Sequence, residues 1–171
     1  MKEEIKRISL MTAIFLTVAL VSSAVEAGVI RINGTIAGSE SYAPFPDPAE
    51  GFYVNGSVTS IDTELGPFTQ FYSAPLDFAF LGMPPGDIAG IRWIVGDAAN
   101  GDSILAWGLG HLGDPDSCTN GDLRHVDPWT IIGGTGRYAG ARGSFTTDQC
   151  SNLDTGETSG TISGTIVVRG R

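Results

Sequence analysis

The sequence predicts an all-β domain that follows a short N-terminal leader. β-Branched, aromatic and polar residues alternate in eight short runs, and Gly, Pro, Asn and Asp cluster between these runs. No segment after the leader shows the spacing of apolar residues that is typical of an amphipathic helix. The spacing of the runs alone fits a β-sandwich as well as a β-barrel.

The first 27 residues have the features of a secretory signal peptide. A basic start precedes an apolar run from Ile8 to Val21, and small residues lead to a cleavage point before Gly28. The apolar run is shorter than the roughly 20 residues that a membrane-spanning helix needs. We therefore expect residues 1–27 to be removed. Residues 28–171 would then form one domain, secreted to the extracellular space or the periplasm.

The charge of the chain excludes several classes of function. The formal net charge is −9, so the protein repels nucleic acids and anionic membranes, and we expect neither as a partner once the leader is cleaved. No lysine follows Lys6, which removes Schiff-base chemistry and a lysine-bound pyridoxal group. We expect no cofactor.

Eight strands are predicted in chain order. The first alternates Ile30, Ile32 and Ile36 with polar residues, and the third is a long aromatic run that Pro75 interrupts or bulges. The others are shorter runs with similar composition. Their predicted ranges are Val29–Ile36, Phe52–Ser60, Pro67–Phe80, Ile91–Asp97, Ser103–Leu109, Trp129–Ile132, Arg142–Asp148 and Thr161–Val168.

Breaker residues separate these strands. Proline-rich segments at 43–48 and 83–87 predict rigid loops. The stretch 110–128 is expected to be the longest connection, and long ordered loops are often functional.

A glycine-rich segment, residues 133–143, is the most distinctive feature of the chain. A phosphate-binding loop would require a Lys-Ser or Lys-Thr pair after its last glycine and then a helix. Here a run that begins with Arg142 and Gly143 continues with β-prone residues instead. We interpret the segment as a turn between two strands, in which glycines allow positive φ and close backbone approach.

The same segment carries a family resemblance. Its pattern, Gly-Gly-Thr-Gly-x-aromatic-x-x-Ala-x-Gly, resembles one shared by allene oxide cyclases and plant dirigent proteins. Leu65–Thr69 and Ala99–Asp102 resemble segments of secreted bacterial relatives of these families, most of them of unknown role, so that the resemblance spans residues 29–168. It implies an eight-stranded antiparallel β-barrel of calycin type with a hydrophobic cavity. The matching residues are Gly133, Gly134, Thr135, Gly136, Tyr138, Ala141 and Gly143.

The resemblance also implies a function. The cavity would bind a small hydrophobic molecule, either as a cofactor-independent cyclase or isomerase or as a dirigent-type guide. In the cyclases a carboxylate lies at one end of the cavity, but the catalytic residues of neither family match this chain residue by residue, so no catalytic residue is assigned. The alternative is a non-enzymatic extracellular binding or structural module whose barrel is packed. The sequence leaves open whether the protein is an enzyme and whether it forms an oligomer.

Six side chains of the predicted strands are candidates for lining the cavity. Aromatic rings inside a small barrel either fill it or line a pocket for an apolar ligand. Charged groups in the barrel would need partners, and charges in strands more commonly face outward. The candidates are Phe71, Tyr72, Arg92, Trp93, Asp97 and Trp107.

Cys118 and Cys150 are the only cysteines of the chain. An even pair in a secreted protein usually forms a disulfide, and we expect this one to form. It would close the loop that precedes the predicted strand at residue 129 onto the end of the following strand.

The loop at residues 114–127 contains candidate calcium ligands but does not match a complete site. Asp114, Asp116, Asn120 and Asp122 provide oxygen ligands around a glycine turn, and calcium stabilisation of the 114–127 loop is an alternative reading. The cysteine in this loop stands where an EF-hand has an oxygen ligand, so we expect no metal site.

His111 and His125 are the only histidines. They lack the spacing of a zinc pair and are expected to be ordinary surface or loop residues.

Overall fold

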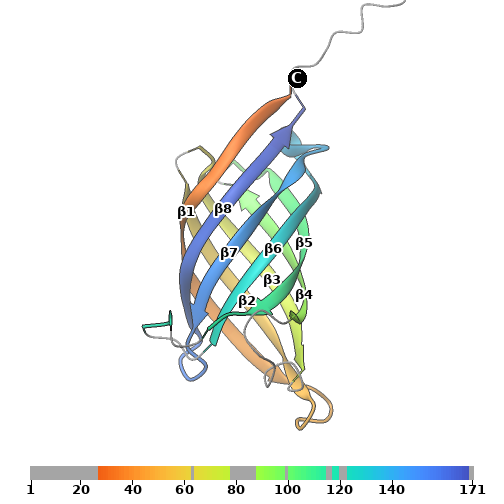
Figure 1. The fold of residues 1–171 in the computed structure, drawn as a ribbon. Helices are drawn as coiled ribbons and strands as arrows, with labels where there is room; N and C mark the ends of the chain where they lie inside the picture. Colours follow the sequence, from red (N-terminus) through yellow and green to blue (C-terminus); the bar gives the residue numbers. More distant parts are fainter. Residues whose placement is uncertain are drawn as a thin grey trace, which may run out of the picture.

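The strands close into a barrel. The computed structural model describes residues 27–62, 64–77, 88–98, 100–114, 117–119 and 123–169. Neighbouring strands pair antiparallel in chain order, and β1 closes the barrel against β8 (Figure 1). The predicted eight-stranded antiparallel barrel is therefore confirmed. Its strands are β1 (Gly28–Pro44), β2 (Gly51–Asp62), β3 (Gly66–Asp77), β4 (Ile88–Ala98), β5 (Ser103–Leu112), β6 (Leu123–Gly134), β7 (Arg142–Ser151) and β8 (Glu157–Val168).

The long first strand makes closure possible. β1 has 17 residues, and its N-terminal part pairs with β8 while its C-terminal part pairs with β2. The two pairings overlap only between Gly34 and Ser39. This stagger is the shear that a tilted, closed barrel requires.

Two strands extend well beyond their predicted ranges. β1 continues to Pro44 and β6 begins at Leu123, six residues before the predicted start. The buried residues of these extensions, Glu40, His125 and Asp127, are polar, and they hide the apolar alternation from which a strand is predicted. Much of the expected long loop 110–128 is therefore strand.

The barrel interior is apolar over much of its length and polar toward one end. The apolar part contains buried residues from β1, β2, β3 and β5 to β8, together with Tyr138 from the glycine-rich turn. Its aromatic members are Phe68, Tyr72, Trp129, Tyr138 and Phe145, and its isoleucines are Ile32, Ile36, Ile104, Ile131, Ile162 and Ile166. The buried polar residues are Glu40, Ser60, Gln70, His125, Asp127, Thr147, Gln149, Ser151 and Thr158.

Inward glycines provide the room that the large rings need. A Cβ atom on Gly96 would overlap the ring of Phe68, and one on Gly56 would overlap the ring of Tyr72. Each ring therefore lies across the backbone of a neighbouring strand, which is a common use of glycine inside small barrels.

The glycine-rich segment is a turn, as predicted. It connects β6 to β7 and contains one short 3₁₀ turn, η2 (Gly136–Tyr138). Gly136 has a φ of +52°, and the Asp102 carboxylate accepts the backbone N–H of Arg137. Tyr138 is fully buried, and this desolvation raises the pKa of its phenol. The segment is therefore a structural cap for one end of the barrel.

No helix among the described residues is long and apolar enough to cross a membrane.

Candidate functional site

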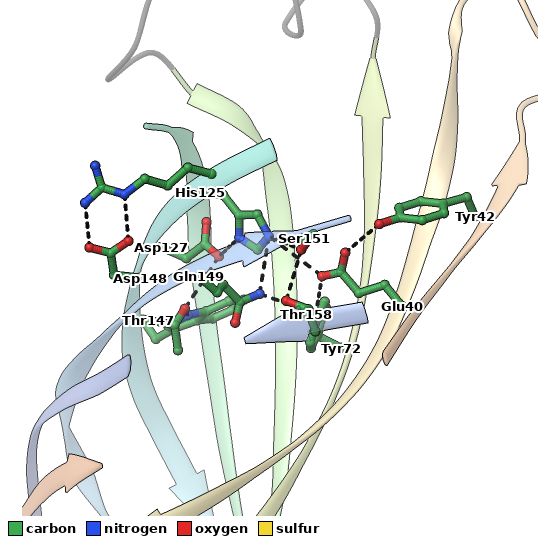
Figure 2. Close-up of polar contacts among 12 residues, drawn as sticks. Glu40, Tyr42, Tyr72, His125, Asp127, Thr147, Asp148, Gln149, Ser151 and Thr158 are labelled. Carbon is green, nitrogen blue, oxygen red and sulfur yellow. Dashed lines mark hydrogen bonds and ion pairs between the residues drawn. The ribbon is translucent and has the colours of Figure 1, made fainter. Parts of the chain in front are cut away.

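Most of the buried polar residues, all except Ser60 and Gln70, gather toward the barrel end opposite the glycine-rich turn. This end carries the β1–β2, β5–β6 and β7–β8 connections, which lie at the bottom of Figure 1. Glu40 lies near the end of β1, His125 near the start of β6, and Ser151 at the end of β7. Because the barrel is closed, these distant parts of the sequence meet in its interior (Figure 2).

An aspartate orients the buried histidine. His125 and Asp127 both point inward from β6, two residues apart, and both are fully buried. The Nδ1 atom of His125 lies 2.9 Å from Oδ2 of Asp127. Thr147 donates a longer hydrogen bond of 3.5 Å to the same oxygen, and Trp129 Nε1 donates to the Thr147 hydroxyl at 2.9 Å. With Nδ1 facing the carboxylate, Nε2 faces the other polar side chains.

Three groups surround this second nitrogen. Nε2 of His125 lies 3.1 Å from Oγ of Ser151, 3.3 Å from Nε2 of Gln149 and 3.7 Å from Oε1 of Glu40. Ser151 donates its hydrogen bond to Thr158 at 3.0 Å, which leaves the Gln149 amide as the donor to the ring. This arrangement suits a neutral imidazole that donates at Nδ1 and accepts at Nε2.

Two phenols bind the Glu40 carboxylate. Tyr42 donates to Oε2 at 2.9 Å, and Tyr72 donates to Oε1. The Gln149 amide donates to the Tyr72 hydroxyl at 3.3 Å and so connects this carboxylate to the histidine. The Glu40 side chain is only 2% exposed. A buried carboxylate requires such donors, because desolvation without them is costly.

The contacts from Ser151 to His125 and from His125 to Asp127 resemble those of a catalytic triad, in which a serine nucleophile contacts a histidine base that an aspartate orients. Ser151 is fully buried and donates to Thr158. The ring nitrogen that would activate it also faces Glu40. The arrangement therefore supports proton transfer among a carboxylate, a phenol and an imidazole rather than attack by the serine.

The strands that carry the network are tied together. The predicted disulfide is confirmed: Cys118 and Cys150 are bonded, with an S–S distance of 2.03 Å. This bond attaches the segment before β6 to β7. On the outer side of the β6–β7 pair, Arg124 donates two hydrogen bonds of 2.9 and 2.7 Å to the Asp148 carboxylate. These bonds lower the pKa of Asp148. Both links hold the end of β7, which carries Gln149 and Ser151.

A shallow depression adjoins the network. Its volume is about 290 Å³, and it is open to the surface. Its lining residues, Ser39–Ser41 and Asn55–Ser57, include Glu40 and Gly56. Glu40 thus belongs both to the buried network and to a concave part of the surface.

The predicted cavity residues are placed differently. Tyr72 is buried in the network. Phe71 and Trp107 are wrong as cavity residues, since they are 52% and 41% exposed. They occupy outward positions because side chains alternate along a strand, and their neighbours Tyr72, Ala106 and Gly108 are buried. Arg92, Trp93 and Asp97 belong to β4, but their side chains lie outside the part of the chain that the structure describes.

The expectation for His125 is also corrected. It was expected on the surface or in a loop, and it is buried in β6. His111 is partly buried at the end of β5. Among the weak calcium candidates, Asp114 is exposed, and Asp116, Asn120 and Asp122 lie outside the described residues. The described residues contain no group of three or more side chains that could hold a metal ion.

Sequence reasoning missed Glu40, His125, Asp127, Gln149 and Ser151 as a group. One signal was present: His125, Asp127, Trp129 and Ile131 alternate in a single register. Extending the predicted strand backward from Trp129 places both polar residues on the buried face.

Comparison with known proteins shows the fold. Neither a family model nor a curated protein matches the chain. The solved structure of a pterocarpan synthase dirigent protein is similar over 85% of this chain and 88% of that chain, with a TM-score of 0.51 and 11% sequence identity. This likeness supports a dirigent-like barrel. The resemblance to allene oxide cyclases and to bacterial relatives stays a prediction.

Proposed function

We propose that the barrel binds a small apolar molecule bearing an oxygen group at its polar end and transfers a proton within it. The reaction class is a cofactor-independent isomerisation or cyclisation, or dirigent-type guidance of a coupling. The dirigent-like fold supports this class, since the similar solved structure is that of a pterocarpan synthase dirigent protein.

The observation that carries the proposal is the buried contact of Glu40 with Tyr72 and His125. A carboxylate can accept a proton from one atom of a bound molecule, and a phenol can return a proton to another atom. The net change is then an isomerisation, which needs no electron acceptor. Asp127 holds the imidazole in the tautomer that accepts at Nε2.

The adjoining apolar side chains support an apolar ligand. Trp129 is buried next to the network and stacks on Phe145, with ring centroids 6.2 Å apart. A molecule at the polar end would therefore contact aromatic rings on one side and hydrogen-bonding groups on the other, which is the usual composition of a small-molecule site.

Substitution of Glu40 by glutamine tests the proposal. The change keeps the shape of the side chain but removes the charge that a ligand hydroxyl would bind. Because a hydrogen bond to a charged group contributes about 1.5–3 kcal/mol, we expect 2-naphthol to bind Glu40→Gln about 10- to 100-fold more weakly than the wild type. Fluorescence titration of 2-naphthol measures the affinity, and circular dichroism verifies the fold.

Two controls accompany this titration. Glu157→Gln removes an exposed carboxylate at the start of β8 and should leave 2-naphthol binding unchanged. Naphthalene, which lacks the hydroxyl, should bind the wild type and Glu40→Gln equally. Equal affinity of 2-naphthol for the wild type and Glu40→Gln would show that the carboxylate is not part of a binding site.

One observation favours a second function. Phe68, Trp129, Tyr138 and Phe145 are all buried in the barrel interior, as expected for a packed barrel. A packed barrel would make the protein an extracellular binding or structural module. The polar network would then contribute to folding and not to ligand binding. Failure of the wild type to bind both 2-naphthol and naphthalene would support this function.

We also propose that the protein is secreted after removal of residues 1–27. The disulfide between Cys118 and Cys150 supports this localisation, because such bonds persist in oxidising compartments.

A further inference from the structure

Among the described residues, Gln70 is the one side chain with two buried polar atoms that lack a hydrogen-bond partner. It lies on β3 and is 0% exposed. Neither its amide nitrogen nor its amide oxygen has a hydrogen-bond partner among the residues that the structure describes. An amide buried without partners costs free energy, and native proteins contain few such groups.

Among the residues that the structure describes, no side chain next to Gln70 forms a hydrogen bond with its amide. Its directly paired residues are Val58 on β2 and Gly96 on β4, neither of which has a polar side-chain atom. The nearby Ser60 hydroxyl donates its hydrogen bond to the backbone oxygen of Phe68 at 3.1 Å. A single buried water needs two to four polar partners to be well held, and the side chains of Val58 and Gly96 supply none.

Gln70 lies on β3, the strand that also contributes Tyr72 to the polar network. Gln70 and Tyr72 stand two residues apart on β3, and both are buried. Their Cα atoms are therefore roughly 7 Å apart along the strand, since each residue rises about 3.3 Å. Tyr72 is the group through which the Glu40 carboxylate and Gln149 are linked.

We infer that Gln70 is a second polar contact for the bound molecule and determines its specificity. This inference rests on the proposed function and narrows its substrate class. The molecule carries one oxygen group that reaches Glu40 and Tyr72, and a second hydroxyl or carbonyl at the other end of a flat apolar body that reaches Gln70. An amide both donates and accepts, so that it binds either kind of oxygen.

Two probes of the same shape test the inference. 2-Naphthol carries one hydroxyl, and 2,6-dihydroxynaphthalene carries hydroxyls at both ends of the same rings. We expect the wild type to bind the diol about tenfold more tightly, which corresponds to one added hydrogen bond. Gln70→Leu should remove this preference and leave 2-naphthol binding within about twofold of wild type.

The stability of the empty protein provides a second readout. Gln70→Leu replaces an unsatisfied amide by an apolar side chain of similar size, so we expect Tm to rise. Gln149→Leu is the matched control: Gln149 is equally buried but donates to Tyr72 and His125, so its replacement should lower Tm. Gln70→Met serves as a second variant in case leucine packs poorly.

The outcomes separate this inference from the proposed function. If the wild type binds both probes equally and Gln70→Leu changes neither affinity, the proposed function stands and the role of Gln70 is refuted. If Gln70→Leu and Gln70→Met lower Tm as much as Gln149→Leu does, a buried water satisfies the amide, and the role is again refuted. If the wild type binds neither probe, both proposals fail.

Discussion

Replacing Trp129 by alanine is expected to destabilise the protein by about 3–5 kcal/mol, the usual cost of truncating a buried tryptophan. The side chain is 2% exposed and stacks on Phe145. Its Nε1–H also holds the Thr147 hydroxyl, which donates to Asp127. The substitution therefore removes apolar packing and loosens the polar network at the same time. Urea denaturation, followed by far-ultraviolet circular dichroism so that the signal does not depend on tryptophan fluorescence, measures the change in the free energy of unfolding.

Trp107 provides a matched control on the same barrel. It is 41% exposed on the outer face of β5, so Trp107→Ala should cost much less than Trp129→Ala. Trp129→Ala should also take up naphthalene in the apolar space that it creates. Equal losses of stability in the two variants would contradict the assignment of Trp129 to the interior.

Removing the disulfide is expected to have the next largest effect. The bond joins residues 32 positions apart, and on the chain-entropy model a closed loop of this size contributes about 3–4 kcal/mol. Replacing both Cys118 and Cys150 by serine should lower the free energy of unfolding by this amount. Because Cys150 lies between Gln149 and Ser151, the variant should also bind 2-naphthol more weakly.

Reduction of the wild type distinguishes loss of the bond from the effect of the serines. Dithiothreitol should lower the stability of the wild type to that of the double variant and leave the double variant unchanged. A double variant as stable as the oxidised wild type would show that the bond constrains little.

The fold was predictable from the sequence, but the choice between sandwich and barrel was not. Alternation identifies strands because successive side chains face opposite sides of a sheet. Closure depends on the stagger of β1 between β8 and β2, which arises from pairing between distant segments. Only the resemblance carried by the glycine-rich turn favoured the barrel, and that turn lies at the end away from the candidate site.

The candidate site was harder to predict, for a physical reason. Prediction of buried strand faces assumes apolar inward residues, whereas Glu40 and Asp127 are polar and buried. Each has one partner on its own strand, Tyr42 for Glu40 and His125 for Asp127. Another strand supplies a second partner: Tyr72 of β3 for Glu40, and Thr147 of β7 for Asp127. Such partners are far apart in the sequence and become neighbours only when the barrel closes.

The same reasoning explains why one aromatic cavity candidate, Tyr72, is buried while Phe71 and Trp107 are exposed. Phe71 and Tyr72 are adjacent in the sequence, and a strand must place them on opposite faces. Composition alone does not decide which face is buried. In the structure Gly56 permits the inward position of Tyr72, because its missing Cβ leaves room for the Tyr72 ring.

The central claim is that the polar end of the barrel holds a small apolar molecule. The most direct test is mass spectrometry of the secreted protein, first under native and then under denaturing conditions. We expect one recurrent small molecule with at least one oxygen atom to be retained by the wild type and lost from Glu40→Gln. A protein that carries no such molecule, and that also fails to take up 2-naphthol, would contradict the claim and identify the barrel as a packed module.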